Sequence, residues 1–214
     1  STSHIGEING KNRFKYEGTR PKSLDSIPYA ALDLLEADPY GHNVLEDYIK
    51  VPVWGIAANN SSAAPFEMKR SLTTVSSRGC PYVDKYNLDF IGFPDDNFAV
   101  DKRRIKKMVP VFKEYGLDAV RWGTHTRMDE ADARIFDMAE SGCVYIGFGA
   151  ESASPHTLTV MQKRGFILKN GVTPTNINGR TYEFPTTMMT AMQNCKKTGV
   201  HGNCTWIMAF PGEE

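Results

Sequence analysis

Hydrophobic and polar positions change their pattern at residue 71. From there on, short apolar runs alternate with segments whose apolar residues recur at helical spacing. The apolar runs predict strands over 72–77, 88–93, 117–123, 143–149 and 200–210. The amphipathic segments predict helices over 100–116, 128–142, 154–165 and 184–199. Strand–helix alternation of this kind predicts an α/β fold built on a parallel sheet.

Several residues mark the predicted helix ends. Asp129 and Ser154 have the side chains of N-caps, and Pro155 suits a first helical position. Pro110 lies inside a helical pattern, where it should kink or shorten the helix. The strands look apolar on both sides of the alternation, which predicts a sheet with both faces covered. Five such strands fit either an open doubly wound sheet or part of a (β/α) barrel.

The first 70 residues form a different region. Asn9-Gly10 between two short mixed segments predicts a small hairpin, and a short helix is expected between Pro28 and Pro39. The apolar content of residues 1–70 is too small for a core of their own. We therefore expect a lead-in or linker here rather than an independent domain.

A second hairpin is predicted within 166–184. Asn178-Gly179 divides this segment, which is long for a connection between a helix and the next element. Long loops in compact domains tend to be functional or mobile. The segment is therefore either a flap on the substrate side or an excursion of the surface.

The charge balance narrows the classes of function. Twenty-five Lys and Arg residues balance 25 Asp and Glu residues, so the formal net charge is zero. That balance gives no electrostatic footprint for nucleic acid or an anionic membrane. No apolar run approaches the roughly 20 residues of a transmembrane helix, and the first ten residues lack a signal-peptide pattern. We expect a soluble cytoplasmic protein, with neither nucleic acid nor a membrane span.

Four cysteines are scattered along the chain without a C-x-x-C pair, so they do not form a disulfide framework. Cys143, Cys195 and Cys204 fall at strand starts or on an apolar helix face, where buried and inert thiols are expected. Cys80 differs, because glycine and proline flank it on a turn. The five histidines have no metal-ligand spacing.

The connection after Cys80 is unusually short. Only the seven residues PYVDKYN separate it from Leu88, where the next predicted strand begins. A parallel crossover with its helix needs about 10–12 residues. The predicted strands over 72–77 and 88–93 therefore cannot both be parallel neighbours with this connection. Either the strand prediction is wrong or residues are absent from the sequence, and we favour the second interpretation.

Four segments carry a resemblance to a known family, and they occur in that family's order: SSRGCPY (76–82), FIGFPDDNF (90–98), IGFGAESASPHTLTVMQK (146–163) and HGNCTWIMAFPGE (201–213). Together they resemble the radical SAM superfamily, and most of all its branch with an N-terminal cobalamin-binding domain. SLDSIPYAALDLLEADPY (23–40) is similar to the linker that joins the two domains of that branch.

The resemblance implies a fold and a domain plan. The fold expected is a partial (β/α)6 barrel of parallel strands, like an incomplete TIM barrel, over residues 71–214. Residues 1–70 would be the linker that follows an absent cobalamin-binding domain. The barrel would be incomplete at the cluster loop and at the C-terminus.

The resemblance also implies a [4Fe-4S] cluster on three cysteines with the spacing C-x3-C-x2-C. Cys80 matches the first of them, and the other two positions fall on Asp84 and Asn87. Neither residue supplies a thiolate, the ligand that such clusters require. Either a segment with the second and third cysteines is missing, or the domain is degenerate and binds no cluster.

The family's S-adenosylmethionine (SAM) contacts can be carried over only where motifs match. The residues that the resemblance implies are Asp95, Asp96, Thr124, Arg127, Glu151, Ser152, Lys163 and Pro211. Structural alternatives stay open for some of them. Asp95 or Asn97 could cap the next helix, Arg127 could pair with Asp129, and Lys163 could be a solvated surface residue.

The function that the resemblance implies is reductive cleavage of SAM at a [4Fe-4S] cluster, with a cobalamin-dependent methyltransferase as the expected enzyme. The expected partners are a small-molecule or peptide substrate and a low-potential electron donor. One alternative is a radical SAM enzyme that forms rings or rearranges carbon skeletons. Others are a SAM-binding domain without a redox role and a cluster-less, non-catalytic α/β domain for binding or scaffolding.

Overall fold

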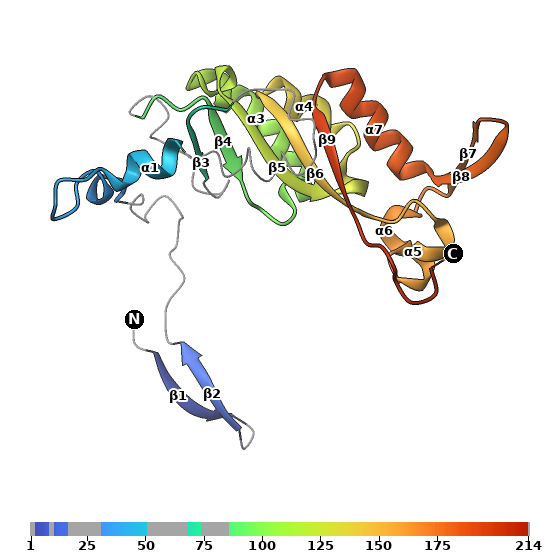
Figure 1. Cartoon of the computed structure of the whole chain (residues 1–214), viewed down its shortest axis with the longest axis horizontal. Coiled ribbons are helices and arrows are strands. Elements are labelled where there is room, and N and C mark those ends of the chain that lie inside the picture. The colour runs from blue at the N-terminus through green and yellow to red at the C-terminus, as the bar shows by residue number, and fades with distance from the viewer. Residues whose placement is uncertain (1–2, 9–10, 17–30, 51–67, 74–85, 214) are drawn as a thin grey trace.

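The computed structural model of the chain describes residues 3–8, 11–16, 31–50, 68–73 and 86–213. Its centre is a five-stranded sheet in the order β3–β4–β5–β6–β9, and every neighbouring pair is parallel (Figure 1). The strands are β3 Ser71–Thr73, β4 Phe90–Phe93, β5 Arg121–Arg127, β6 Cys143–Glu151 and β9 His201–Trp206. This confirms the predicted α/β fold with a parallel sheet. Within the described residues the sheet is open, with β3 and β9 as its outer strands.

Helices connect the strands. They are α1 Val44–Lys50, α3 Lys102–Glu114, α4 Arg134–Glu140, α5 Pro155–Val160, α6 Arg164–Ile167 and α7 Thr186–Thr198. Short 3-10 turns lie at η2 Leu32–Leu35, η3 Phe98–Val100, η4 Leu117–Ala119 and η5 Met128–Glu130. No helix among the described residues is long and apolar enough to cross a membrane.

The core lies between the sheet and helices α3, α4 and α7. Alternate side chains of β4, β5 and β6, such as Phe93, Trp122 and Phe148, pack against Ile105 of α3 and Ile135 of α4 in one buried cluster. Strand order follows chain order from β3 to β6. Because parallel crossovers share one hand, such an order sends successive helices to the same face of a sheet. Among the described residues, the opposite face receives no such layer.

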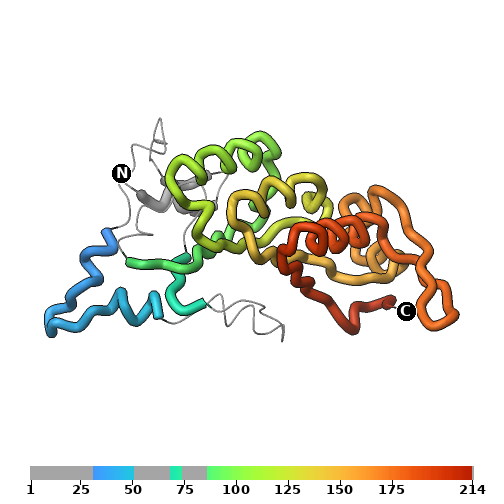
Figure 2. Tube along the Cα trace, turned by 90° about the horizontal axis from the view of Figure 1, so that it is seen from above, coloured from blue at the N-terminus to red at the C-terminus, as the bar shows by residue number. Residues whose placement is uncertain are grey.

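Two hairpins confirm the turn predictions. β1 Ser3–Ile8 and β2 Lys11–Tyr16 pair antiparallel around Asn9-Gly10. β7 Val172–Ile177 and β8 Arg180–Pro185 pair around Asn178 and Gly179, whose φ angles of 52° and 81° fit the left-handed positions of a tight hairpin turn. Helix α1 and the β7–β8 hairpin lie at opposite ends of the molecule (Figure 2).

The structure corrects the prediction that the strands on either side of Cys80 cannot be parallel neighbours. β3 Ser71–Thr73 pairs in parallel with β4, with Leu72 opposite Ile91. Residues 74–89 separate the two strands as described, and this length is sufficient for a crossover. Cys80 and Asp84 lie outside the described residues, so the cluster loop stays a prediction.

Three further predictions need correction. Asp129 does not cap α4, which begins at Arg134; it lies in the 3-10 turn η5. Pro110 does not shorten α3 to its own position, because the helix continues to Glu114. The third strand is β5 at Arg121–Arg127 rather than 117–123, because residues 117–119 form a 3-10 turn. Ser154 does cap α5, since its Oγ accepts a hydrogen bond from the Thr157 main chain at 3.2 Å.

Candidate functional site

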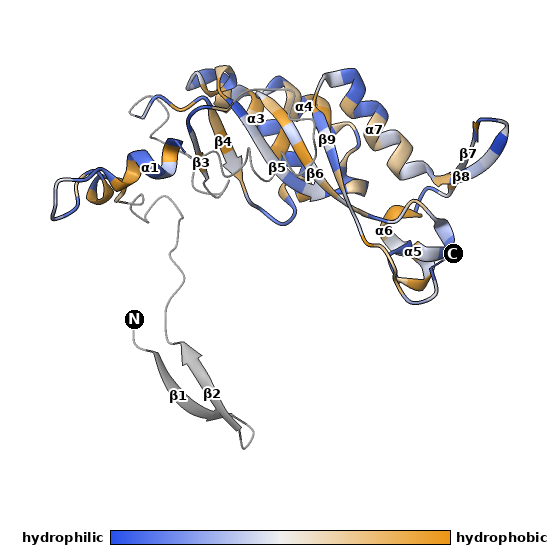
Figure 3. Ribbon diagram, viewed as in Figure 1, coloured by the Kyte–Doolittle hydropathy of each residue, from blue (hydrophilic) through white to orange (hydrophobic). Residues whose placement is uncertain are grey.

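On the face of the sheet opposite the helices, β5 and β9 carry mostly polar side chains, which corrects for these strands the prediction of strands that are apolar on both sides, whereas Phe90 of β4 and Tyr145 of β6 are buried there. Side chains at alternate positions of β5, β6 and β9 point to this face, and neighbouring strands align them in rows: Gly123–Tyr145–His201, His125–Gly147–Asn203 and Arg127–Gly149–Thr205. Blue and white colours accordingly run along β5 and β9 in Figure 3. A parallel sheet covered by helices on both faces would be apolar there.

The rings of this face contact one another. Tyr145 lies between the two histidines, stacked on His201 with ring centroids 5.9 Å apart and edge-on to His125 at 6.5 Å. The Asn203 amide donates to the Tyr145 hydroxyl at 3.2 Å. His125 lies over Gly147, where a Cβ atom would come within 2.4 Å of the imidazole Cδ2. Glycine at 147 is therefore what allows the imidazole to lie against the sheet.

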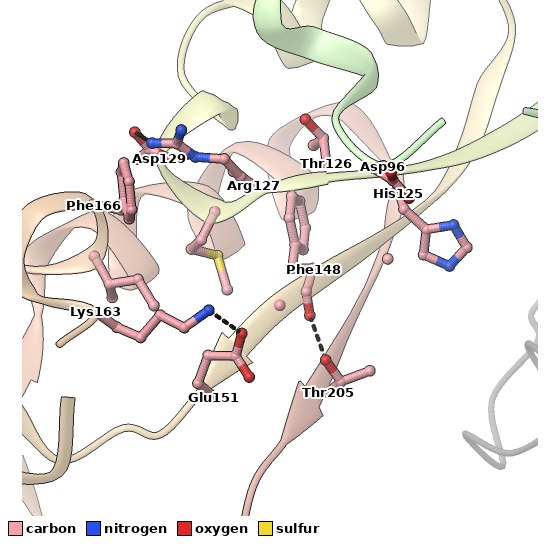
Figure 4. Close-up of a pocket in the computed structure, with 14 residues that line it drawn as sticks. Asp96, His125, Thr126, Arg127, Asp129, Phe148, Glu151, Lys163, Phe166 and Thr205 are labelled. Carbon is pink, nitrogen blue, oxygen red and sulfur yellow. Dashed lines mark hydrogen bonds and ion pairs between the residues drawn. The ribbon is translucent and has the colours of Figure 1, made fainter. Parts of the chain in front are cut away.

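A pocket of about 370 Å³ opens where this face meets the carboxyl ends of the strands (Figure 4). The ends of β5, β6 and β9 line it, together with Asp96 from the loop after β4 and Lys163 and Phe166 from the α5–α6 segment. Its volume lies within the range of small-molecule pockets. The carboxyl edge is where ligands bind in open α/β sheets and in barrels.

Glu151 and Lys163 form an ion pair at one side of the pocket. Lys163 Nζ lies 3.1 Å from Glu151 Oε1, with 19% of the Glu151 side chain exposed. Glu151 has a φ angle of 64° at an irregularity in the β6–β9 pairing. Such a conformation is costly for a residue with a side chain and recurs at functional sites. The left-handed backbone at Glu151 bends the end of β6 and directs the carboxylate toward the pocket.

A second charged cluster forms the other side. The Arg127 guanidinium makes two bonds to the carboxylate of Asp129, at 2.9 and 2.7 Å, and lies over the Phe166 ring at 3.8 Å from its centroid. Lys169 Nζ donates to the same carboxylate at 3.1 Å. Burial alone would raise the pKa of Asp129, but the bonds from Arg127 and Lys169 outweigh it and lower the pKa. Asp129 is therefore ionised at neutral pH.

His125 is the titratable group at the right-hand end of Figure 4, beside Asp96. Desolvation by the surrounding protein lowers the pKa of His125, and the nearby charge of Asp96 opposes this only in part. The imidazole is therefore neutral at pH 7, and one ring nitrogen can accept a proton or a hydrogen bond.

The structure brings four of the predicted SAM contacts into the pocket: Asp96, Arg127, Glu151 and Lys163. The others lie elsewhere. Thr124 is buried on the helix side and donates to the Phe93 carbonyl at 2.9 Å. Ser152 is buried and accepts from the Ser154 main chain at 3.1 Å.

Two more predicted contacts, Asp95 and Pro211, do not line the pocket. Asp95 is half-buried beside Asp96, and Pro211 is exposed after β9. Neither Asp95 nor Asn97 caps α3, because the Asp101 carboxylate accepts from the Arg103 main chain instead. The Asn97 side chain accepts from the Thr126 hydroxyl at 2.8 Å.

Several residues that line the pocket were not predicted from the sequence, among them His125, Asp129, Phe166 and Thr205. His125 and Thr205 could have been found from strand alternation, had β5 been extended to Arg127. Phe166 and the supporting Lys169 come from the α5–α6 segment, and no local pattern indicates which residue of that segment turns toward a strand end.

The described residues do not fit an iron–sulfur cluster. Cys143, Cys195 and Cys204 all belong to the core on the helix side of the sheet, and burial raises the pKa of each thiol, to about 12 for Cys195. A cluster needs several thiolates at one place. In the described part of the chain, no group of three or more His, Cys, Asp or Glu side chains could hold a metal ion.

The chain is similar to a curated methyltransferase, although no protein-family model matches it. The uncharacterised methyltransferase PH0819 of Pyrococcus horikoshii is 28% identical over 214 residues, which cover 96% of this chain and 42% of the relative. The chain thus spans less than half the length of the curated relative it matches.

Two solved structures align with part of the chain. The radical S-adenosylmethionine methyltransferase TsrM from Kitasatospora setae, with cobalamin and a [4Fe-4S] cluster bound, aligns with a TM-score of 0.42 and 14% identity, over 58% of this chain and 23% of TsrM. TsrM with tryptophan substrate and the SAM analogue aza-SAM aligns with a TM-score of 0.40 and 14% identity, over 57% of this chain and 22% of TsrM.

Proposed function

We propose that this chain is the SAM-binding part of a methyltransferase and that SAM binds in the pocket at the carboxyl edge of the sheet. The observation that carries the proposal is the Glu151–Lys163 pair, which places one negative and one positive group in a pocket of suitable size. The methyltransferase relative supports the reaction class.

The pair suits the charges of SAM. The methionine part of SAM carries an ammonium and a carboxylate, and charge-assisted hydrogen bonds are the strong ones in proteins. Glu151 would accept from the ammonium and Lys163 would donate to the carboxylate. Thr205, whose hydroxyl already donates to the Phe148 carbonyl at 3.3 Å, would offer its lone pairs to the ribose.

The motifs of the chain support a narrower proposal, in which the enzyme is of the radical SAM kind and uses a [4Fe-4S] cluster, with cobalamin as a further cofactor. Cys80 would be one cluster ligand. Because the described residues do not fit a cluster, we assign no step to it. What these residues can supply is binding and orientation of SAM and exclusion of water around its sulfonium.

Equilibrium dialysis of the full chain with SAM tests the proposal. We expect saturable binding that Glu151→Gln and Lys163→Gln each weaken about tenfold, the size of one charge-assisted bond. Neither substitution should change binding of 5′-methylthioadenosine, which lacks the amino-acid part. Glu183→Gln, on the exposed β8 strand, serves as the matched control. Absence of saturable SAM binding, or equal affinity in all variants, would contradict the proposal.

A further inference from the structure

One buried carboxylate in the pocket wall holds two cations. The Asp129 side chain is 7% exposed, and it is bonded by both Arg127 and Lys169. Lys169 Nζ also donates to the Asp129 main-chain oxygen at 3.2 Å. One negative charge therefore faces two positive charges, and this Arg127–Asp129–Lys169 cluster carries an excess of one positive charge.

Neighbouring acids do not cancel this excess. Glu151 is paired with Lys163. Glu130 and Asp132 are balanced by Arg134 together with Lys102, which is paired with Asp132 at 3.1 Å. The remaining pocket carboxylate, Asp96, lies beside His125 at the opposite end from Asp129 (Figure 4). The positive charge is thus local to one side of the pocket, although the chain as a whole is neutral.

Arg127 is held in a fixed orientation. Its Nε and Nη2 atoms are bonded to Asp129, and the flat side of the guanidinium lies on Phe166. Among the contacts of the described residues, Nη1 donates to no protein acceptor, and 39% of the Arg127 side chain is exposed. A guanidinium that is fixed in this way offers its remaining donors to a ligand at little entropic cost.

Apolar surface lies next to these donors. Phe166 is 46% exposed at the pocket, and Met128 and Ile167 line the same side. An anion that binds here would therefore place its attached atoms against an aromatic ring. This combination of a fixed cation and an exposed ring suits a carboxylate joined to an apolar or aromatic group.

We propose that the Arg127–Asp129–Lys169 cluster with Phe166 is a subsite for the carboxylate of the methyl acceptor, and that the acceptor is an organic acid with an apolar or aromatic body. This inference rests on the proposed function, because it assigns the second substrate of the same pocket. SAM would occupy the Glu151–Lys163 side, and the acceptor would lie toward Phe166.

Ligand-observed NMR with benzoate and its uncharged analogue benzamide tests the subsite on the full chain. We expect benzoate to bind at least about tenfold more tightly than benzamide, and Arg127→Gln and Lys169→Gln each to remove about tenfold of that preference. Lys196→Gln, which changes an exposed lysine of α7, should leave both probes unaffected. Lys169 is exposed, so its variant keeps the test valid if Arg127→Gln fails to fold.

The carboxylate that binds this subsite could also come from SAM itself. A competition experiment distinguishes SAM from the methyl acceptor. If the subsite belongs to the acceptor, saturating SAM leaves benzoate bound and Arg127→Gln leaves SAM affinity unchanged. Displacement of benzoate by SAM, with weaker SAM binding by Arg127→Gln, would overturn the inference, as would equal binding of benzoate and benzamide. Benzoate binding in a chain that does not bind SAM would refute the proposed function while leaving the anion subsite intact.

Discussion

At the scale of single residues, the face of the sheet opposite α3, α4 and α7 requires glycine where a larger residue would displace a ring. Gly147 is the clearest case, because the space of its missing side chain is filled by the His125 imidazole. The same contact contributes to the desolvation that lowers the pKa of His125. The identity of residue 147 thus sets both the position and the protonation state of a side chain on the neighbouring strand.

Gly147→Ala should therefore change the titration of His125. The added methyl group would lie 2.4 Å from the imidazole Cδ2, so the ring must swing away into solvent. We expect the pKa of His125 to rise toward its ordinary value of 6.5, as measured by NMR titration of the histidine ring nitrogens. Gly165→Ala is the control, since nothing lies within 4 Å of its added Cβ. An unchanged pKa in Gly147→Ala would show that this contact does not hold the ring.

At the scale of elements, a salt bridge ties α1 to the edge of the sheet. The Arg70 guanidinium bonds both carboxylate oxygens of Glu46, at 3.0 and 2.6 Å, and donates to the Tyr86 main chain at 2.9 Å. Leu45 and Ile49 of α1 pack with Tyr86 and Leu88 in a small cluster of their own. This contact joins part of residues 1–70 to the first strand of the sheet.

The pH dependence of stability should report this salt bridge. The hydrogen bond from Arg70 lowers the pKa of Glu46 from 4.5 to about 2. A carboxyl whose pKa is depressed on folding stabilises the fold above its unfolded pKa and loses that contribution as pH falls. Urea unfolding of wild type and Glu46→Gln should therefore differ above pH 4.5 and converge as pH falls toward 2. If the difference in unfolding free energy persisted at pH 2, Glu46 would stabilise the fold through packing rather than through its charge.

Some secondary-structure elements could be predicted from the sequence and others could not. The Asn178-Gly179 turn was predictable, because its left-handed backbone strongly favours these two residues. β5 was placed too early, because its residues Gly123, His125 and Arg127 do not look like a buried strand. These residues form a strand because only the face of β5 that carries Trp122 packs against helices. Which face packs is decided by the assembled sheet and not by the sequence of the segment.

At the scale of the whole molecule, the sheet separates two kinds of chemistry. Its helix side holds the apolar core and three of the four thiols, and its other side holds His125, His201 and the charged pocket. The charged clusters at the strand ends could not be read from the sequence, because Asp129 and Lys169 are far apart in the chain and share no motif. They meet only because α6 ends beside the turn that follows β5.

Because Cys143, Cys195 and Cys204 lie on the apolar side of the sheet, we predict that their thiols react slowly in the folded protein. In a Cys80→Ser variant, the folded protein should react only slowly with Ellman's reagent at pH 8, because burial raises the pKa of Cys143, Cys195 and Cys204 and thiolates are the reactive form. After unfolding in guanidinium, three thiols should react, because the chain has four cysteines and one of them is replaced.

A positive control comes from the other face of the sheet. Thr205→Cys in the same background places a thiol on the exposed pocket side and should react rapidly in the folded state. Fast reaction of the Cys80→Ser protein itself would mean that a core thiol is accessible, and the division of the sheet into an apolar and a polar side would then be wrong. Slow reaction would leave Cys80 as the one cysteine of this chain available to a metal cluster, because a thiol that stays protonated and buried among apolar side chains cannot bind iron.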